Sequence, residues 1–425
     1  ALPILNEAEL LRDVKTYRTK GIPLDLIFLD YDWFLFGGDG WGDFQWNSDN
    51  FPSAQSGKLL LRLKDDWGVK VATIRKPSLR PRTVQWEEAK NLGFLYKVED
   101  FTSRGFPPFG KWNLNGTSSE FNFSTPAARS WWWSHSAPLL ESGIWGYWND
   151  ENEAHFNFRT ADMQRTYYEG ERSTNNNRRV WSLNRNFYLG AQRYGFISWP
   201  GDLNSNFEDM ATQRAVMLNT IALGQSWWSM DVGGFRGKPW WLDPFRFEGN
   251  PSYENYTRWM QFGAFTPVFR IHGRRNNERE PWKFGEVAEA VAKKYIGLRY
   301  QLLPYLYSLA ALNTERGLPM IRPMYFQFPN DKLCTEQYAQ WMVGDALLVR
   351  PVVEKGAKTV DVYLPEGNWI DFWNHQRIAG PTTISYSLDV IGFSDIPLFI
   401  REGAIIPLAP PMDYVGQAAI DPLTV

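Results

Sequence analysis

The chain has 425 residues, with 45 Lys and Arg against 47 Asp and Glu, and neither sign of charge forms a long block. This balance argues against nucleic acid as a partner, because such binding needs a basic stripe, and no apolar run approaches the roughly 18 residues of a membrane span. A single Cys334 excludes an internal disulfide framework, and four His without a His-x-x-x-His pair give a zinc site little to build on.

Aromatic residues are abundant, with 22 Trp, 19 Tyr and 28 Phe. Trp side chains gather within residues 131–133, 145–148, 227–228 and 240–241. Sugars present flat C–H faces that stack on such rings, so Trp residues beside carboxylates are candidate sugar contacts. Packing in a large core is the ordinary explanation for any single Trp, because Trp and Phe bury about 150–250 Å² each.

Between residue 5 and about residue 310, amphipathic helical stretches alternate with short apolar runs, which is the pattern of parallel βα units. We predict strands at Leu24–Leu29, Val69–Ile74, Ile144–Trp148, Arg179–Leu183, Gly195–Ser198, Ser226–Met230 and Val268–Ile271. We predict helices at Glu7–Lys20, Gly57–Trp67, Thr125–Glu141, Thr160–Glu171, Glu208–Leu223 and Tyr253–Phe262. Such units either close into a barrel or form an open doubly wound sheet. No Gly-x-Gly-x-x-Gly follows the first strand, which weakens the dinucleotide-binding form of the open sheet.

After a long helical region at Val287–Arg316, residues 333–408 show short alternating runs divided by Pro, Gly and Asn turns. The clearest runs are Lys358–Leu364, Thr383–Leu388 and Pro397–Ile406. This pattern predicts an antiparallel β-sandwich appended to the βα units. We expect the boundary near residues 320–335.

Charged or strongly polar residues follow six of the seven predicted strands. The C-terminal strand ends of a parallel barrel share one rim, where the βα loops make a single pocket. The residues at these ends are Asp30, Asp150, Arg185, Asp202, Asp231 and His272. A single Asp after a strand is commonly a helix cap or a turn former, but six strands that share a rim make this explanation weaker.

Such a rim suits glycoside hydrolysis, which needs two carboxyl groups in different protonation states on either side of one bond. A Mg²⁺-dependent barrel enzyme is an alternative, because carboxylates at several strand ends also bind hard cations. Phosphoryl transfer fits less well, since the only Gly-rich segment, Gly37–Gly40, contains no Lys.

Several motifs are spread over nearly the whole chain. They include Gly21–Asp25, Trp148–Glu153, the Asp-x-Gly-Gly-Phe stretch at Asp231–Phe235, the Arg-x-His stretch at Arg270–His272, and Pro397–Pro407. Together they resemble glycoside hydrolase family 31, which contains retaining α-glucosidases, α-xylosidases and α-galactosidases. The resemblance implies an α/β fold: a (β/α)8 TIM barrel at residues 1–328, a small antiparallel β-sandwich at residues 329–410, and the start of a further C-terminal segment at residues 411–425. It implies no metal or organic cofactor.

The resemblance also implies roles for individual residues. Asp150, in the Trp-x-Asp-x-Asn-Glu stretch, would be the nucleophile, and Asp202, which closes a Trp-x-Gly-Asp stretch, would be the general acid/base. The expected sugar-binding residues are Asp30, Ile74, Trp148, Arg185, Trp199, Asp231, Phe235 and His272. Glu151 and Glu153 are rival nucleophiles, although alternation at a strand end should turn Glu151 away from Asp150.

We therefore expect an exo-acting retaining α-glycosidase that removes a terminal hexose, with an α-glucoside or an α-galactoside as substrate. The expected partners are an oligosaccharide or glycoside and further domains of the same polypeptide, with no nucleic acid and no membrane. An α-N-acetylgalactosaminidase, a transglycosylase, and a catalytically silent carbohydrate-binding protein remain alternatives. Retention predicts that the carboxyl groups of Asp150 and Asp202 lie about 5–5.5 Å apart.

Some residues depart from the family pattern. Glu151 stands where many family α-glucosidases carry Met, Tyr31 where they carry Ile, and Trp148 where the α-xylosidases carry Lys, so substrate preference stays open. Arg75 and Lys76 add positive charge near the rim. A solvated loop is the ordinary explanation for this pair, whereas side chains that face the pocket would suit an acidic, sulfonated or amide-bearing substrate.

An eight-stranded barrel needs one strand more than the seven that we find. In the resembling family a strand precedes the helix at Glu7–Lys20, after an N-terminal β-sandwich. We therefore expect a longer polypeptide, in which either residues 1–5 or a further segment fills this place, because an open gap would leave unpaired strand edges.

Overall fold

The computed structural model describes residues 4–35, 43–81, 83–97, 117–150, 157–174, 177–186, 188–237, 250–274, 277–421 and 423–424. The chain divides into two compact units, Ala1–Thr19 with Leu24–Gly201, and Lys20–Pro23 with Asp202–Val425. Within the described ranges, no helix is long and apolar enough to cross a membrane.

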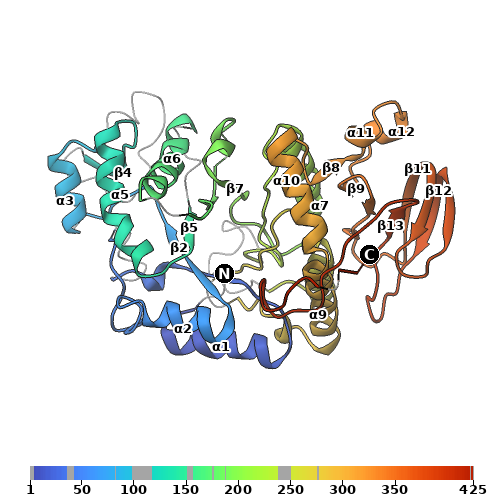
Figure 1. Cartoon of the computed structure of the whole chain (residues 1–425), viewed down its shortest axis with the longest axis horizontal. Helices are drawn as coiled ribbons and strands as arrows, with labels where there is room; N and C mark the ends of the chain where they lie inside the picture. Colours follow the sequence, from blue (N-terminus) through green and yellow to red (C-terminus); the bar gives the residue numbers. More distant parts are fainter. Residues whose placement is uncertain are drawn as a thin grey trace. The chain divides into compact units, whose positions relative to one another are not determined.

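The first unit contains a five-stranded parallel sheet with the order β1-β2-β5-β6-β7 (Figure 1). Its strands are β1 (Leu26–Leu29), β2 (Lys70–Arg75), β5 (Gly146–Asn149), β6 (Ser182–Asn184) and β7 (Phe196–Ser198). In this register Arg75 pairs with Asn149, Asn149 with Asn184, and Asn184 with Ser198. The C-terminal ends of four neighbouring strands are therefore level with one another, and the first five predicted strands are confirmed.

Helices precede or follow most of these strands, as the βα pattern requires. They are α1 (Glu7–Thr19), α2 (Lys58–Trp67), α3 (Val84–Asn91), α5 (Pro126–Glu141) and α6 (Asn157–Ser173). The start of α5 is set by Thr125, whose side chain accepts a hydrogen bond from the amide of Ala128, and by a proline at the first helical position. A two-stranded sheet, β3 (Leu95–Lys97) with β4 (Thr117–Phe121), belongs to the same unit.

The second unit begins with α7 (Phe207–Ala222), α8 (Tyr253–Gly263), α9 (Glu286–Gln301) and α10 (Leu303–Arg316). The helical region predicted at Val287–Arg316 is therefore two helices. The break falls at Leu302, because Pro304 takes a position in the first turn of α10, where a missing amide hydrogen is tolerated.

The strands predicted at Ser226–Met230 and Val268–Ile271 are not regular strands, and this expectation was wrong. The two segments run parallel, with hydrogen bonds from the amide of Val268 to the carbonyl of Trp228 and an isolated bridge between Val232 and Ile271. A longer ladder cannot form beyond Val232, because the next two residues are glycines with left-handed φ angles.

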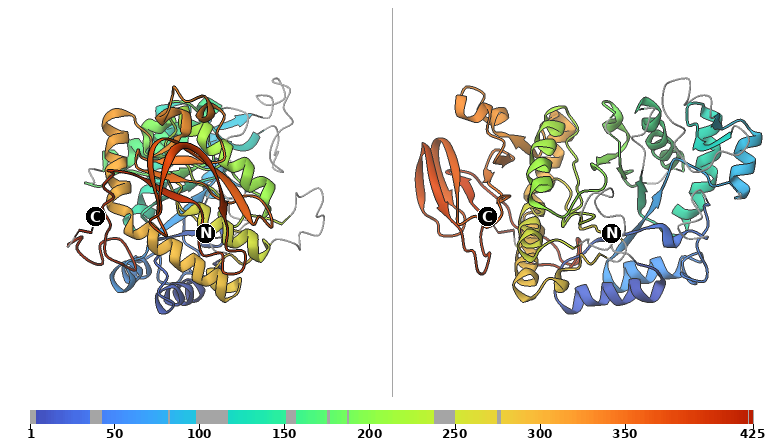
Figure 2. Two further views of the ribbon diagram at one scale, coloured as in Figure 1. Left: turned by 90° about the vertical axis from the view of Figure 1, so that its right-hand side faces the viewer. Right: turned by 180° about the vertical axis from the view of Figure 1, so that it is seen from behind.

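The predicted antiparallel β-domain is confirmed and contains a six-stranded sheet with the order β12-β11-β13-β10-β9-β8. Its strands are β8 (Ile321–Pro323), β9 (Trp341–Val343), β10 (Leu347–Val349), β11 (Thr359–Asp371), β12 (Arg377–Ser387) and β13 (Leu398–Arg401). The long pair β11 and β12 lies at one edge (Figure 2). Two short helices, α11 (Met324–Gln327) and α12 (Lys332–Thr335), complete the domain, and Cys334 of α12 lies in its apolar core.

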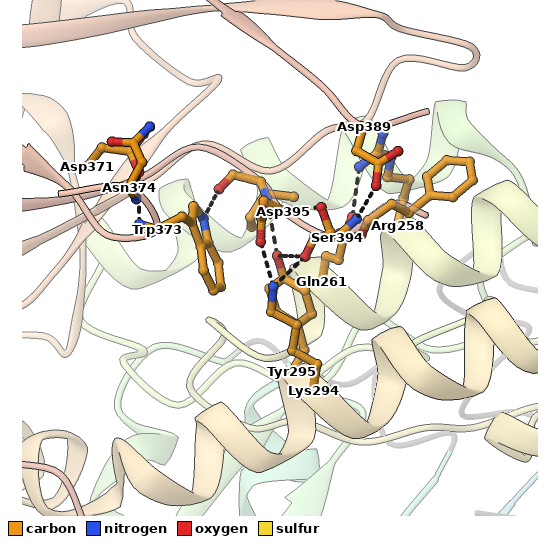
Figure 3. Close-up of polar contacts among 12 residues, drawn as sticks. Arg258, Gln261, Lys294, Tyr295, Asp371, Trp373, Asn374, Asp389, Ser394 and Asp395 are labelled. Atoms are coloured by element: carbon orange, nitrogen blue, oxygen red, sulfur yellow. Dashed lines mark hydrogen bonds and ion pairs between the residues drawn. The ribbon is translucent and has the colours of Figure 1, made fainter. Parts of the chain in front are cut away.

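The loop at residues 389–396, between β12 and β13, connects this domain to α8 and α9 (Figure 3). Lys294 of α9 pairs with Asp395 at 2.5 Å, and its ammonium group donates to the carbonyl of Ser394 at 2.9 Å. The hydroxyl of Tyr295 donates to the same carbonyl and accepts from the amide of Ile396. The β-domain is thus joined to α9 through main-chain groups of this loop.

Helix α8 makes the second connection. Gln261, a buried residue, donates from its side-chain amide to the carbonyl of Phe393 at 2.6 Å and accepts from the guanidinium group of Arg258 at 2.9 Å. The guanidinium group of Arg258 also lies 4.7 Å from the centre of the Phe393 ring. Phe393 holds a left-handed φ of 49°, which this set of contacts must stabilise.

Candidate active site

Main-chain hydrogen bonds continue the parallel sheet one residue past each strand end. The amide of Asp150 donates to the carbonyl of Arg75 at 2.8 Å, and the amide of Arg185 donates to the carbonyl of Asn149 at 3.0 Å. The amide of Trp199 donates to the carbonyl of Asn184 at 3.1 Å. The predicted site residues after β5, β6 and β7 therefore share one edge of the sheet.

Side chains from three strand ends meet at the carboxylate of Asp150, whose side chain is only 10% exposed. A guanidinium nitrogen of Arg185 lies 3.4 Å from Oδ1. The hydroxyl of Tyr31 donates to Oδ2 at 3.1 Å, and the ammonium group of Lys76 lies 3.6 Å from the same oxygen. Nearby positive charges favour the ionised carboxylate. The rival residues Glu151 and Glu153 lie outside the described residues.

Asp30 follows β1 at the same edge. Its side chain accepts a hydrogen bond from the amide of Tyr31 at 2.9 Å and caps a short 3₁₀ turn at Tyr31–Trp33. The pKa of Asp30 is raised from 3.8 to about 7, mainly by burial and also by the negative charge of Asp150, although the Tyr31 amide and Lys76 each lower it. Two neighbouring carboxyl groups therefore differ in their surroundings, as catalytic sites often require.

Arg75 and Lys76 are both buried, so their interpretation as a solvated loop was wrong. Consecutive side chains of a strand point to opposite faces. The guanidinium group of Arg75 lies 4.0 Å from the centre of the Phe44 ring and 5.6 Å from that of Trp132, and burial lowers its pKa. Lys76 points to Asp150 instead. Only one of the two cations thus reaches the candidate site.

The expected apolar contacts of the first unit lie within the core. Trp148 and Trp199 are 3% and 1% exposed, with ring centres 5.8 Å apart at an angle of 66°. Ile74 is 1% exposed, and its carbonyl accepts from the indole of Trp33. Packing accounts for these positions, and sugar contact by them stays a prediction.

The predicted site residues of the second unit are held together by main-chain pairing. The amides of Phe235 and Arg236 both donate to the carbonyl of Leu203, the residue after Asp202, at 2.8 and 3.0 Å. The rings of Phe235 and His272 lie 5.0 Å apart. The residue after Asp202 is therefore bonded to the Asp-x-Gly-Gly-Phe stretch, and Phe235 of this stretch contacts the ring of His272.

Two buried arginines support this arrangement. Arg270 forms an ion pair with Asp231, and both side chains are almost fully buried, which fits a supporting role for Asp231. Arg279 donates to the carbonyl of Gly234 at 2.7 Å and to the hydroxyl of Ser205 at 2.9 Å. Burial lowers the pKa of Arg279 to about 10. Arg279 was missed in the sequence, because nothing in the surrounding residues 274–283 marks it as functional.

The contacts of Tyr31 and Lys76 with Asp150 were also missed. In the sequence Tyr31 stands out only as a departure from a family pattern, although its position directly after Asp30 places it at the same strand end. A hydrogen bond of 2.7 Å between the side chains of Asn149 and Asn184, which braces the ends of β5 and β6, was missed as well. Among the described residues, no three His, Cys, Asp or Glu side chains are grouped so that they could hold a metal ion.

Two family models match the chain, one over the βα units and the other over the β-domain. A family model described as the glycosyl hydrolases family 31 TIM-barrel domain matches residues 4–309, and one described as the glycosyl hydrolase family 31 C-terminal domain matches residues 317–406. Together with the parallel and antiparallel sheets, these matches confirm the predicted fold class.

Similar proteins include a 1,6-alpha-glucosyltransferase of Sporosarcina globispora, 38% identical over 98% of this chain and 33% of the relative. The alpha-glucosidase 2 of Bacillus thermoamyloliquefaciens is 32% identical over 95% of this chain and 51% of the relative. A solved glycoside hydrolase family 31 dextranase of Flavobacterium johnsoniae, complexed with glucose, is similar with a TM-score of 0.84 and 32% identity, over 98% of this chain and 52% of that one. The chain thus spans a third to about half of the length of these relatives.

Proposed function

The chain belongs to glycosyl hydrolase family 31, and from this membership we propose that it is the catalytic part of a retaining, exo-acting α-glycosidase. Asp150 is the nucleophile of this proposal, and Asp202 is the general acid/base. The observation that carries the proposal is the carboxylate of Asp150, which follows a parallel strand and lies next to the cationic groups of Arg185 and Lys76. An attacking carboxylate must be ionised, and this environment favours ionisation.

The reaction proceeds by two displacements. A carboxylate oxygen of Asp150 forms an ester bond to the anomeric carbon, while the leaving oxygen departs with the proton of Asp202. Water then loses a proton to Asp202 and attacks the same carbon, and the electron pair of the ester bond returns to Asp150. Asp30, Arg185 and His272 bind hydroxyl groups of the terminal sugar, because they offer acceptors and donors at their strand ends.

The names of the relatives favour a glucosyl substrate. The similar proteins include an alpha-glucosidase, a 1,6-alpha-glucosyltransferase and a dextranase complexed with glucose, and alpha-xylosidases are also among them. We therefore place an α-glucoside first, and an α-galactoside or an N-acetylgalactosaminide behind it.

Transfer of the glycosyl group to a second sugar is the second candidate function. It is favoured by the 38% identity to a glucosyltransferase over 98% of this chain. Transfer uses the same Asp150 ester, with a sugar hydroxyl in place of water in the second displacement.

A panel of aryl α-glycosides tests the proposal, with glucose, galactose, xylose and N-acetylgalactosamine as the sugar. Proton NMR follows the anomer that is released first. Release of the α-anomer from the glucoside is expected, and a disaccharide acceptor added to the same reaction distinguishes transfer from hydrolysis. Initial release of the β-anomer, or carboxyl groups roughly 6.5–9.5 Å apart in an ordered crystal structure, contradicts retention. No turnover of any glycoside favours a silent carbohydrate-binding protein.

A further inference from the structure

Lys76 is held between the nucleophile of the proposed function and an aromatic ring. Its ammonium group lies 3.6 Å from Oδ2 of Asp150 and 5.2 Å from the centre of the Tyr31 ring, and its side chain is 3% exposed. Burial of an ammonium group is costly unless an opposite charge or an aromatic face compensates, and here both are present. The charge of Lys76 is therefore stabilised by two groups of the site, the carboxylate of Asp150 and the ring of Tyr31.

Lys76 and Tyr31 act on the same oxygen atom. The hydroxyl of Tyr31 donates to Oδ2 of Asp150, and the ammonium group of Lys76 lies beside that atom, whereas Arg185 lies beside Oδ1. Hydrogen-bond donors and cations stabilise a carboxylate more than an ester, because the ester has lost the negative charge. These two side chains therefore affect the two displacements in opposite directions.

We propose that Lys76 and Tyr31 are positioning residues that make Asp150 a good leaving group in the second displacement, and so keep the glycosyl-enzyme short-lived. This inference rests on the proposed function.

The two steps show why the effects oppose each other. In the first step the carboxylate of Asp150 gives an electron pair to the anomeric carbon, and the charge that Lys76 stabilises disappears. In the second step water or an acceptor hydroxyl attacks that carbon with transfer of its proton to Asp202, the bond to Asp150 breaks, and the charge returns beside Lys76. Removal of the cation should therefore spare the first step and slow the second.

The test compares Lys76→Met and Tyr31→Phe with the unmodified protein on a dinitrophenyl α-glucoside, whose leaving group makes the second step limit kcat. Lys70→Met is the matched control: Lys70 begins the same strand, at its other end, with its ammonium group 4.6 Å from the centre of the Trp145 ring. Rapid mixing measures the burst of dinitrophenol, and intact mass spectrometry measures the glycosyl-enzyme.

For Lys76→Met we expect kcat to fall at least about fivefold while kcat/KM changes by less than about twofold. The burst should stay close to one equivalent, and the glycosyl-enzyme should persist at least about fivefold longer than in the unmodified protein. Tyr31→Phe, which keeps the ring beneath the ammonium group, should give a smaller change in the same direction. Lys70→Met should leave both constants unchanged.

A folded Lys76→Met protein in which kcat and kcat/KM fall by the same factor, without accumulated glycosyl-enzyme, overturns the inference and leaves the proposed function standing. A Lys76→Met protein without a cooperative unfolding transition is not folded. In that case the same measurements on Tyr31→Phe test the inference. An unmodified protein that turns over no α-glycoside overturns the proposed function and this inference together.

Discussion

Asp30 and Asp150 lie at one edge of one sheet in opposite electrostatic settings. Asp150 is next to the cationic groups of Arg185 and Lys76. Asp30 is partly buried beside the negative charge of Asp150, and its pKa is raised to about 7. Cationic groups thus lie beside one of the two carboxyl groups, whereas the pKa of the other is raised toward neutral pH.

Asp30→Asn should make the stability of the folded protein less dependent on pH. The pKa of Asp30 in the folded protein, about 7, is above the value of 3.8 for an unfolded chain. Stability from the protonated group is therefore complete below about pH 4 and is lost as the pH rises to about 7. We expect the unfolding temperature of Asp30→Asn, relative to the unmodified protein, to rise over this range and then stay level. The exposed Asp65→Asn serves as the control, and a constant difference across all pH values contradicts this account.

The same substitution should reduce activity. If Asp30 binds a sugar hydroxyl, Asp30→Asn weakens a charge-assisted hydrogen bond worth roughly 1.5–3 kcal/mol. A decrease in kcat/KM of at least about tenfold is expected on the glucoside of the panel. Unchanged kinetics would place Asp30 outside the sugar pocket.

Substitution of the two proposed catalytic residues should give different patterns. Asp150→Ala should abolish turnover of every substrate, because no ester can form. Asp202→Ala should retain activity on substrates with good leaving groups, which need no proton, and azide should increase that activity by capturing the glycosyl-enzyme. Steady-state rates on dinitrophenyl and methyl glycosides measure the difference. An equal loss of rate on the two kinds of glycoside would contradict the acid/base role of Asp202 and make Asp30 the next candidate for it.

Positions directly after a strand could be predicted from the sequence, whereas contacts between strand ends could not. Asp150 and Arg185 were found because each follows an apolar run. The contacts of Tyr31 and Lys76 with Asp150 depend on the order and register of β1, β2 and β5, which no short stretch of sequence encodes. The roles of all these residues remain predictions.

At the scale of elements, the Asp-x-Gly-Gly-Phe loop depends on the backbone of its two glycines. Gly233 and Gly234 have φ angles of 93° and 76°. A Cβ on Gly234 would lie 2.5 Å from Cα of Ser205, next to the segment that carries Asp202. Only glycine permits this turn and this close approach together.

Gly234→Ala should therefore destabilise the protein by about 1–3 kcal/mol from backbone strain, with more from the contact with Ser205. It should also lower kcat/KM, because Phe235 and the Asp202 segment must shift. Gly297→Ala is the matched control: Gly297 lies inside α9 with no atom near its missing Cβ, and alanine should stabilise that helix by roughly 0.5–1 kcal/mol. Urea unfolding of both variants provides the measurement, and equal effects would contradict the strain argument.

Most elements could be predicted because their signals are local. Thr125 before Pro126 marks the start of α5, and alternating apolar residues mark β11. The segments at Ser226–Met230 and Val268–Ile271 have strand-like composition, but the glycine turn after Val232 and a buried Arg270–Asp231 pair replace a regular ladder. Tertiary contacts of this kind override local propensity.

At the scale of the whole molecule, the loop at residues 389–396 is one of the connections between the β-domain and the helices of its own unit. Gln261 of α8 and Lys294 of α9 both bind main-chain carbonyls of the loop at residues 389–396. The exposed carboxylate of Asp389 accepts from the amides of Ile391 and Gly392, which fixes the start of the loop and lowers the pKa of Asp389. The loop and the two helices should therefore open together.

Gln261→Ala should test this coupling. It leaves a buried donor of Arg258 and the buried carbonyl of Phe393 without their partner, at about 1–3 kcal/mol for each group. Hydrogen exchange followed by mass spectrometry should show faster exchange in residues 255–263 and 389–396 together, because local opening is cooperative. Gln376→Ala, in an exposed turn before β12, should change neither segment. Faster exchange in only one segment would show that they open independently.

The contacts of the loop at residues 389–396 with α8 and α9 limit how genes of this family can be recombined. Lys294 and Gln261 precede their acceptors in the loop by 100 and 132 residues, so a crossover at the start of the β-domain separates them from these acceptors. A hybrid that takes its β-domain from a distant relative would keep these contacts only if its own loop places main-chain carbonyls in the same positions. A working hybrid should keep the loop of the protein that supplies α8 and α9. Alternatively, α8 and α9 should be exchanged together with the β-domain.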